Sequence, residues 1–504
     1  MVMKKYIQTS FYLLFVVTIT LIQSCSKDLD VNNPNEPDSE LIFSNPGMVQ
    51  KVAQSSFVKW WYINTTDLSP RMAMWVMADQ GTCSWANRGM YHLSSEPRAP
   101  FNNETSYTYA SINENYWKHL YASYFMANGV VNSIVNDSMK IEIDGKDETA
   151  KTLAFALFTR GLDIGYLGLV YDQGAIAKNP YVQEVDSSFY PYYRLIDEAI
   201  ASMDMVIQIC NENSFTLSDS EGWISGNSIN QSDLKKLASS YAARFLVYSS
   251  RTKEANDALD WNQVLEYAED GITQDFTLMM DDQIWKSYFR KYTVRPGWAR
   301  IDARIIHLLD ESYPWRFPED GHNPEAATSA DGRLESDFHF SPVCNMKPER
   351  GYYHYSNYEY SRYEYAYNPD VLTGEVPEML AYENSLFKAE AMARLGNIDG
   401  ALAIINNGPR TDPDRGNLPD ATAANLDDFL KILFYERDIE LIQTGFGIAF
   451  FDMRRRDMLQ KGTMLHFPVP GRELMALQLS IYTFGGITNA DGVNTSNGGW
   501  FPAK

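Results

Sequence analysis

The chain has 504 residues, and its 65 acidic and 43 basic side chains give a formal charge of −22 at pH 7. Such an acidic surface repels phosphate backbones and argues against a nucleic-acid partner. Because 45% of the residues are hydrophobic and 13% are aromatic, the chain can bury a large core, which argues against an intrinsically disordered protein. The length is typical of two or three domains, but one large body is equally compatible with it.

The N-terminus has the features of a bacterial secretory signal that ends in a lipidation site. Lys4 and Lys5 precede an apolar run at 11–22, which is short for a bilayer span and is followed by Ser24 and Cys25. We predict a signal peptide at 1–24 and a lipid on Cys25. An ordinary signal peptide with an incidental cysteine is the alternative. Without Lys4 and Lys5, the mature chain has 41 basic residues and a formal charge of −24.

A tether follows the lipidated cysteine. Residues 26–38 are polar, acidic and interrupted by prolines, so we assign 25–40 to the lipidated cysteine and a flexible tether, and 41–504 to one folded body. An acidic stretch at this place resembles the surface-export signal of Bacteroidetes lipoproteins. The predicted location is the outer membrane, with the protein lipid-anchored and facing the cell exterior.

The remaining cysteines and the histidines give no metal or disulfide pattern. Cys83, Cys210 and Cys344 are widely spaced, and the seven histidines are scattered. Neither Cys-x-x-Cys nor His-Glu-x-x-His occurs, so we predict no metal site and no cofactor.

Helical periodicity dominates the first half of the folded body. Apolar residues recur at helical spacing in five successive segments joined by short links, which indicates antiparallel packing. Asp233 and Asp260 are the expected caps of the fourth and fifth helices. The five predicted helices are 116–135, 148–170, 192–209, 233–250 and 261–272.

A repeat signal follows at 389–405, which resembles one tetratricopeptide unit. Ala389 permits close helix approach, Gly396 makes the turn, and Ala401 and Ile405 fill the second helix. One such repeat cannot bury its own apolar face, so the earlier helix pairs are its expected neighbours. An isolated helical hairpin is the alternative.

Residues 425–455 carry a resemblance to a known family. A helix with Glu436-Arg437 and Glu440-Leu441, a glycine turn at 445–447 and an aromatic-Asp-x-Arg-Arg run ending at Arg455 resemble the C-terminal signature of SusD/RagB-type lipoproteins of Bacteroidetes. The run 467–470, which resembles the proline-bounded strand of that family, the repeat at 389–405, the helix at 117–128 and the lipobox lie where that family has them.

The resemblance implies a mainly α fold, built of tetratricopeptide-like helical repeats with long irregular loops and a few short β-hairpins. It also implies a cell-surface protein without catalytic activity, which binds oligosaccharides or polysaccharides and delivers them to a partner TonB-dependent, SusC-like outer-membrane transporter. The charged side chains at 436–455 are then expected to form structural ion pairs between helices.

Two aromatic and polar stretches, 85–103 and 285–316, are the expected ligand-binding loops, because loops that project from a helical scaffold commonly carry function. Sugar rings offer C–H faces to aromatic planes and hydroxyls to polar neighbours. Composition alone selects six candidate glycan-binding residues: Trp85, Asn87, Arg88, Trp285, Trp298 and Arg300.

A third stretch, 352–367, is crowded with tyrosine. Its second half alternates as a half-buried strand does, and we predict an edge hairpin over the helical core rather than a recognition surface.

Two other functions remain open. The first is a peptide-binding, RagB-like uptake lipoprotein with the same architecture. The second is a surface glycoside hydrolase that uses carboxylates such as Asp281 and Asp282, although their adjacency does not indicate the opposed geometry that this chemistry requires.

Overall fold

The computed structural model describes residues 39–82, 85–177, 188–347, 350–351, 355–368, 371–488 and 495–500. The predicted signal peptide, Cys25 and most of the predicted tether lie outside these residues. The chain divides into two compact units, Met1–Asn45 and Pro46–Lys504. The described part of the first unit contains helix α2 (Ser39–Phe43).

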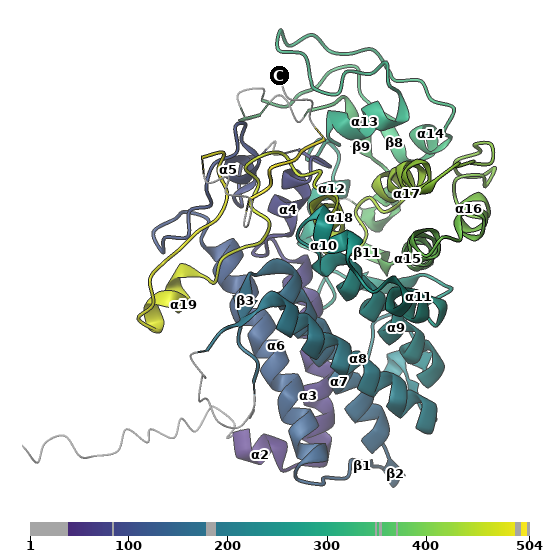
Figure 1. The fold of residues 1–504 in the computed structure, drawn as a ribbon. Coiled ribbons are helices and arrows are strands. Elements are labelled where there is room, and N and C mark those ends of the chain that lie inside the picture. Colours follow the sequence, from purple (N-terminus) through teal and green to yellow (C-terminus); the bar gives the residue numbers. More distant parts are fainter. Residues whose placement is uncertain are drawn as a thin grey trace, which may run out of the picture. The chain divides into compact units, whose positions relative to one another are not determined.

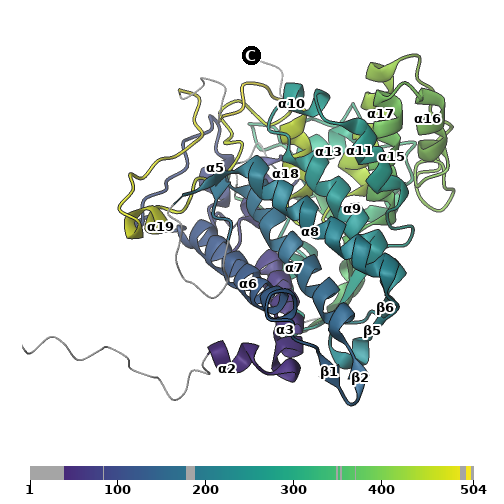
Figure 2. The same ribbon diagram turned by 60° about the horizontal axis from the view of Figure 1, so that its bottom comes forward.

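Long helices that pack side by side form the body of the second unit (Figure 1). Each helix contacts the next in the order α3, α6, α7, α8 and α9, and Figure 2 shows the same succession from another side. Four of the five predicted helices are found here with similar bounds. The helices are α3 (Pro46–Thr65), α6 (Ser111–Val135), α7 (Thr149–Val170), α8 (Tyr192–Glu212) and α9 (Gln231–Ser249).

Helix α7 is the central member of this array. Among the described residues it is the helix whose length and hydropathy match a membrane span, but it is largely buried in the unit, as the core helix of a globular protein is. Its glycines allow α8 to approach closely. A Cβ at Gly161 would lie 3.3 Å from the Ala199 carbonyl oxygen, and one at Gly168 would lie 3.1 Å from that of Tyr192.

The helix caps correct one prediction and confirm another. Helix α9 is capped by Asn230, whose side chain accepts from the backbone N–H of Asp233 at 3.1 Å. Asp233 is therefore not the cap. It lies at the third helical position and accepts from the Asn230 N–H in a reciprocal capping box. Asp260 caps α11 (Trp261–Glu269) as predicted, accepting from the N–H of Asn262 at 3.0 Å.

Three helices near the C-terminus extend the array through α11, which packs on α15. The predicted tetratricopeptide-like pair is present, because α15 and α16 pack together and Gly396 makes the turn between them with φ 93°. Ala389, Ala401 and Ile405 are fully buried. The helices are α15 (Ala381–Arg394), α16 (Ile398–Asn406) and α17 (Leu426–Glu440).

The charged family motif forms buried ion pairs, as the resemblance implies. Arg455, on α18 (Ile448–Arg455), pairs with Glu390 of α15 at 2.8 Å, and Glu436 of α17 accepts from Arg333 at 2.7 Å. Arg454 differs from this expectation. Its guanidinium donates to three backbone carbonyls, those of Leu169, Tyr248 and Leu465, and so ties three segments together.

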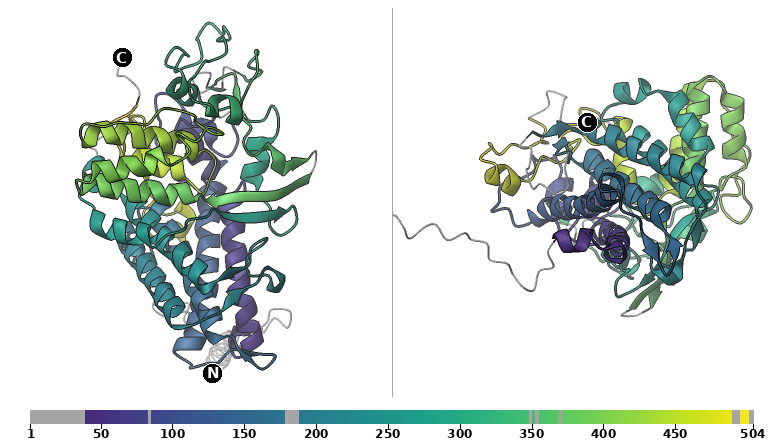
Figure 3. Two further views of the ribbon diagram at one scale, coloured as in Figure 1. Left: turned by 90° about the vertical axis from the view of Figure 1, so that its right-hand side faces the viewer. Right: turned by 90° about the horizontal axis from the view of Figure 1, so that it is seen from below.

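The largest sheet among the described residues consists of β7 (Phe276–Asp281), β11 (Val371–Met379) and β10 (Tyr367–Asn368), with antiparallel pairing. Figure 3 shows β7 and β11 as a ribbon that projects beside the stacked helices of the repeat region. The other strands form two-stranded pairs: β1 (Glu142–Ile143) with β2 (Lys146–Asp147), β3 (Gln173–Gly174) with β4 (Tyr190–Pro191), β5 (Thr216–Leu217) with β6 (Ile229–Asn230), and β8 (Phe338–Phe340) with β9 (Tyr358–Tyr360).

The tyrosine-rich stretch does not form the predicted hairpin. Residues 352–354 lie outside the described part, 358–360 pair with 338–340, and 367–368 pair with β11. The alternating segment between them contains a 3-10 turn, Glu364–Ala366, because buried Tyr363 packs under the Arg290 guanidinium at 4.2 Å instead of continuing a strand.

Short helices and long connections complete the unit. Helices α4, α5, α12 and α13 gather at one end of the long helices (Figure 1). The strand expected at 467–470 is absent: Phe467 makes only a single parallel bridge to Tyr171. The short helices are α4 (Arg71–Met77), α5 (Met90–Ser94), α10 (Lys253–Asp257), α12 (Tyr288–Val294), α13 (Ala303–Leu309), α14 (Arg333–Asp337) and α19 (Gly471–Ala476).

Candidate functional site

Two loops from distant parts of the sequence are joined by their backbones at the end of the helical array. Gly81 forms an antiparallel bridge with Ile301, and the Thr82 N–H donates to the Arg300 carbonyl at 3.1 Å. The first loop follows α4 and the second precedes α13. The bridge therefore fixes the position of the residues that follow Thr82 relative to those that precede Arg300.

Glycine is required at the centre of this bridge. A Cβ at position 81 would lie 2.0 Å from the Trp75 ring, closer than any real contact. Trp75 in turn meets Phe289 and Tyr292 edge-on, with ring centroids 6.0 and 6.4 Å apart. The absence of a side chain at Gly81 thus allows the first loop to lie directly on a buried aromatic cluster.

The aromatic series continues from this cluster to the surface. Tyr292 contacts Trp298 with ring centroids 6.3 Å apart, and Trp298 contacts Trp85 at 5.2 Å and an interplanar angle of 51°. The Arg295 guanidinium lies 4.3 Å from the centroid of the Trp298 ring. Trp85 is 48% exposed although it is a large apolar side chain. We call Trp85 and Trp298 the tryptophan platform.

The turn that carries Trp85 is strained. Ala86 and Arg88 both have left-handed backbones, with φ values of 55° and 52°, and neither is glycine. The Tyr109 hydroxyl donates to the Ala86 carbonyl at 3.3 Å, and Arg88 forms an ion pair with Asp67. Such backbone strain persists only where surrounding contacts hold it, and it is concentrated at functional sites.

Polar groups lie beside the platform. Asn87 Oδ1 and Arg88 Nε are buried and have no hydrogen-bond partner among the residues that the structure describes. Tyr288 lies close to the Arg88–Asp67 pair: burial and the negative charge of Asp67 raise its pKa, and the positive charge of Arg88 opposes this. The Arg88 side chain is 33% exposed, so a donor group lies next to an exposed aromatic ring, a combination that suits a polyhydroxylated ligand.

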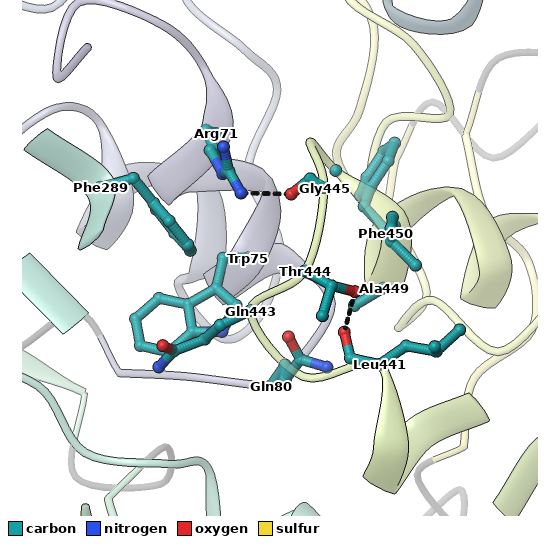
Figure 4. Close-up of a pocket in the computed structure, with 12 residues that line it drawn as sticks. Arg71, Trp75, Gln80, Phe289, Leu441, Gln443, Thr444, Gly445, Ala449 and Phe450 are labelled. Atoms are coloured by element: carbon teal, nitrogen blue, oxygen red, sulfur yellow. Dashed lines mark hydrogen bonds between the residues drawn. The ribbon is translucent and has the colours of Figure 1, made fainter. Parts of the chain in front are cut away.

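A small cavity lies next to the buried aromatic cluster but is not a ligand site. Arg71, Trp75, Gln80 and Phe289 line one side, and residues 441–450 line the other (Figure 4). Its volume of about 20 Å³ holds about one water molecule. Arg71 donates to the Gly445 carbonyl in Figure 4, and burial lowers the Arg71 pKa to about 10.

The structure brings together four of the six residues that the sequence selects, namely Trp85, Asn87, Arg88 and Trp298. Trp285 is only 8% exposed and packs in the core against Phe57 and Trp61, with centroids 6.1 and 6.5 Å apart. Arg300 is buried and forms an ion pair with Glu359. Neither Trp285 nor Arg300 is presented at the exposed face, so we leave both out of the proposed site.

The adjacent carboxylates at 281–282 belong to a tight turn. Asp281 Oδ1 accepts from the backbone N–H groups of Gln283 and Trp285, both at 2.8 Å. Asp282 is the left-handed residue of this turn, with φ 57°. Among the described residues, no group of three or more His, Cys, Asp and Glu side chains is arranged to hold a metal ion.

Comparison with known proteins identifies the fold. No protein-family model matches the sequence, and no curated protein matches it either. Solved structures do match. A SusD-like carbohydrate-binding protein from Bacteroides fragilis has a TM-score of 0.60 at 13% identity, over 82% of this chain and 86% of that one. The chain has the SusD-like fold.

Two further solved structures agree. A SusD superfamily protein from Parabacteroides distasonis matches with a TM-score of 0.57 at 14% identity, over 88% of this chain and 99% of that one. A structure with xylogluco-oligosaccharide matches with a TM-score of 0.51 at 12% identity, over 81% of this chain and 82% of that one. At these identities the likeness concerns the SusD-like fold, which confirms the fold that the sequence resemblance implies.

Sequence reasoning missed the groups that hold the platform in this SusD-like fold. Asp67 lies in the connection between α3 and α4, far from either aromatic stretch, and Tyr109 supports the Trp85 turn from the segment before α6. No local pattern marks these two residues. Tyr292 lies within the second predicted stretch, but its role in supporting Trp298 depends on the tertiary contact.

Proposed function

We propose that the chain is a cell-surface glycan-binding protein whose tryptophan platform receives an oligosaccharide. The observation that carries the proposal is the exposed Trp85 ring, which a strained turn holds against half-buried Trp298 and beside the partly exposed Arg88 side chain. Trp85 and Trp298 would stack on sugar rings, while Asn87 and Arg88 would bind hydroxyls. This assignment requires no chemical change of the ligand, so the proposed role is binding and not catalysis.

The matching structures support this choice of ligand. One is named a carbohydrate-binding protein and another was determined with xylogluco-oligosaccharide. Both share the SusD-like arrangement of helices with this chain, and glycan capture is the function that fits an aromatic platform on that arrangement.

The proposed setting follows from the N-terminal sequence. With residues 1–24 removed and a lipid on Cys25, residues 25–40 would tether the body, 41–504, to the outer membrane on its external face. From there the protein would deliver oligosaccharides to a SusC-like, TonB-dependent transporter. The mature charge of −24 would disfavour adsorption to anionic lipid surfaces and would leave the lipid as the attachment.

Affinity electrophoresis tests the proposal. Residues 26–504 are run in gels that contain neutral or acidic polysaccharides, beside Trp85→Ala, Trp298→Ala and the control Tyr365→Ala, which removes an exposed aromatic ring outside the platform. We expect one polysaccharide to retard the unmodified chain and the control, and to retard both tryptophan variants less. Equal retardation of all four proteins would contradict the platform.

A peptide ligand is the competing outcome. A panel of short peptides, tested by calorimetry on the same proteins, separates the two ligands. If Trp85→Ala weakens peptide binding and no polysaccharide gel retards the protein, the platform is a binding site but its ligand is a peptide and not a glycan. Release of reducing sugars from a polysaccharide would contradict the non-catalytic role.

A further inference from the structure

A second and larger pocket lies away from the tryptophan platform, between helix α6, the β3–β4 pair and α19. Its volume is about 450 Å³, which is within the range of about 300–1,000 Å³ typical of small-ligand sites. It shares no lining residue with the platform or with the small cavity beside Trp75. Figure 1 shows α19 next to α6 at the edge of the array.

One wall of this pocket is a row of aromatic rings. Trp117, Tyr121 and Phe125 follow one another at intervals of four residues and therefore lie on one face of α6. The centroids are 4.7 Å apart for Trp117 and Tyr121, and 6.0 Å for Tyr121 and Phe125. Phe189 meets Trp117 edge-on at 5.9 Å. Phe125 is 43% exposed, whereas Trp117 and Tyr121 are 6% and 8% exposed, so Phe125 is the ring of the row that a ligand can reach.

The aromatic wall is fixed before any ligand arrives. The Tyr121 hydroxyl donates to the Ala175 carbonyl at 3.1 Å and accepts from the Ala175 N–H at 2.6 Å. These two hydrogen bonds to the Ala175 backbone anchor the middle ring of the row to the segment after β3. A preorganised wall costs less conformational entropy on binding than a mobile one.

The charges at the rim balance. Arg472 pairs with Glu114 at 3.4 Å, and its side chain is 73% exposed. Lys118 and Glu473 add one further charge of each sign to the lining. Burial raises the pKa of Glu473. The two positive and two negative side chains cancel, so the rim has no net attraction for a cation or an anion and offers both donors and acceptors to a neutral ligand.

We propose that this pocket is a second carbohydrate site, which takes a neutral pyranose with its C–H face on Phe125, the exposed end of the aromatic row, and its hydroxyls on Glu473, Lys118 and Arg472. An aromatic row surrounded by both donors and acceptors satisfies a ring that is apolar on its faces and polar at its edge. The inference rests on the proposed function, because it assigns the same class of ligand to a second place on the chain.

Two sites on one chain have a consequence for polymers. A polysaccharide long enough to reach both would bind more tightly than a short oligosaccharide that fits one, because the second contact becomes intramolecular. Loss of either site would then weaken retention of the polymer more than it weakens binding of a single sugar ring.

Fluorine NMR on the full chain tests this pocket directly. Tryptophan is replaced by 5-fluorotryptophan, the Trp117 signal is assigned by its loss in Trp117→Phe, and four probes are titrated: the methyl glycosides of glucose, galactose, mannose and xylose. The variants are Phe125→Ala, Glu473→Gln, the double variant Trp85→Ala/Trp298→Ala, and the control Tyr193→Ala, an exposed ring outside the pocket. Thermal unfolding of each variant checks that it is folded.

We expect at least one glycoside to shift the Trp117 signal in the unmodified chain, in Tyr193→Ala and in the Trp85→Ala/Trp298→Ala variant. Phe125→Ala should weaken the apparent affinity about tenfold, and Glu473→Gln severalfold, as expected for groups at the centre of a binding site. A Trp117 signal that no glycoside moves, or that responds equally in Phe125→Ala, would overturn the proposal.

The two proposals fail separately. If the platform variants leave polysaccharide retention unchanged while Trp117 still responds to a glycoside, the platform is wrong and the second pocket stands. If polysaccharide retention depends on Trp85 and Trp298 while Trp117 does not respond, the function stands and the second pocket is wrong.

Discussion

Arg437 and Asp452 form a buried ion pair between α17 and α18, with Arg437 Nε 2.7 Å from Asp452 Oδ1. Burial alone would raise the Asp452 pKa, but the charges of Arg437, Arg456 and Arg455 hold it well below its usual value. Asp452 is thus the negative centre of three guanidiniums. Removal of a buried partner is costly because it leaves the other charges uncompensated.

We therefore expect Asp452→Asn to lower the free energy of unfolding by about 3–5 kcal/mol at pH 7. Because the folded pKa is depressed, the contribution of Asp452 is present above the unfolded pKa of about 3.9 and is lost as pH falls below it. The difference between the two proteins should shrink as the medium is made more acidic. Urea unfolding at several pH values measures it, with the exposed Asp420→Asn as control. An equal loss in both variants would contradict the assignment.

Asp163 should show the opposite pH dependence. It lies fully buried on α7, and burial raises its pKa well above the usual value despite opposing contributions from Ser123 and Lys59. Because the folded pKa is raised, its contribution is fully present below the unfolded pKa of about 3.9 and is lost as pH rises through the folded value.

Asp163→Asn, which carries no charge at any pH, is therefore expected to gain stability relative to the original chain as pH rises from about 4 to 8. Thermal unfolding across that range measures the gain. A variant whose relative stability does not change with pH would show that Asp163 is not a buried titrating group.

Gly81→Ala tests the bridge under the tryptophan platform. A methyl group there would collide with the Trp75 ring at 2.0 Å, so we expect a loss of about 1–3 kcal/mol of stability together with weaker glycan binding. Trp75→Leu removes the ring atoms of that collision. The double variant Gly81→Ala/Trp75→Leu should consequently lose less than the sum of the two single changes, measured by urea unfolding. Simple additivity would contradict a steric cause.

Asp67→Asn separates positioning from direct contact at the platform. Asp67 holds Arg88, whose left-handed backbone lies in the Trp85 turn. We expect the variant to bind the retained oligosaccharide about tenfold more weakly in calorimetry, as Arg88→Met should. If Arg88→Met weakens binding and Asp67→Asn does not, Arg88 contributes by direct contact with the ligand and not by holding the Trp85 turn in place.

The helices were predictable because their signal is local. Apolar spacing within 116–135 and 148–170 predicts two helices that the structure contains, and Asp260 correctly marks the start of a third. Asp233 was misassigned because Asn230, three residues earlier, is an equally good cap and the reciprocal box uses both. The hairpin predicted in the tyrosine-rich stretch is wrong because alternation does not show which segment a strand will pair with, and the two ends of this stretch pair with different segments.

The candidate site was predictable in its parts but not in its assembly. Composition selected Trp85 and Trp298, yet their contact depends on the Gly81–Ile301 bridge between distant loops. Composition also selected Trp285, which the tertiary fold buries against Phe57. Whether a tryptophan is exposed follows from packing, and no local pattern encodes it.

The Gly81–Ile301 bridge also determines when the platform can exist. Its two sides are separated in the sequence by helices α6 to α9, so the bridge is a long-range contact whose formation closes a long loop. A chain that has not finished folding contains both tryptophans but does not hold their ring centroids 5.2 Å apart. Affinity for the ligand would consequently report that folding is complete, and an immature or damaged molecule would not compete for sugar.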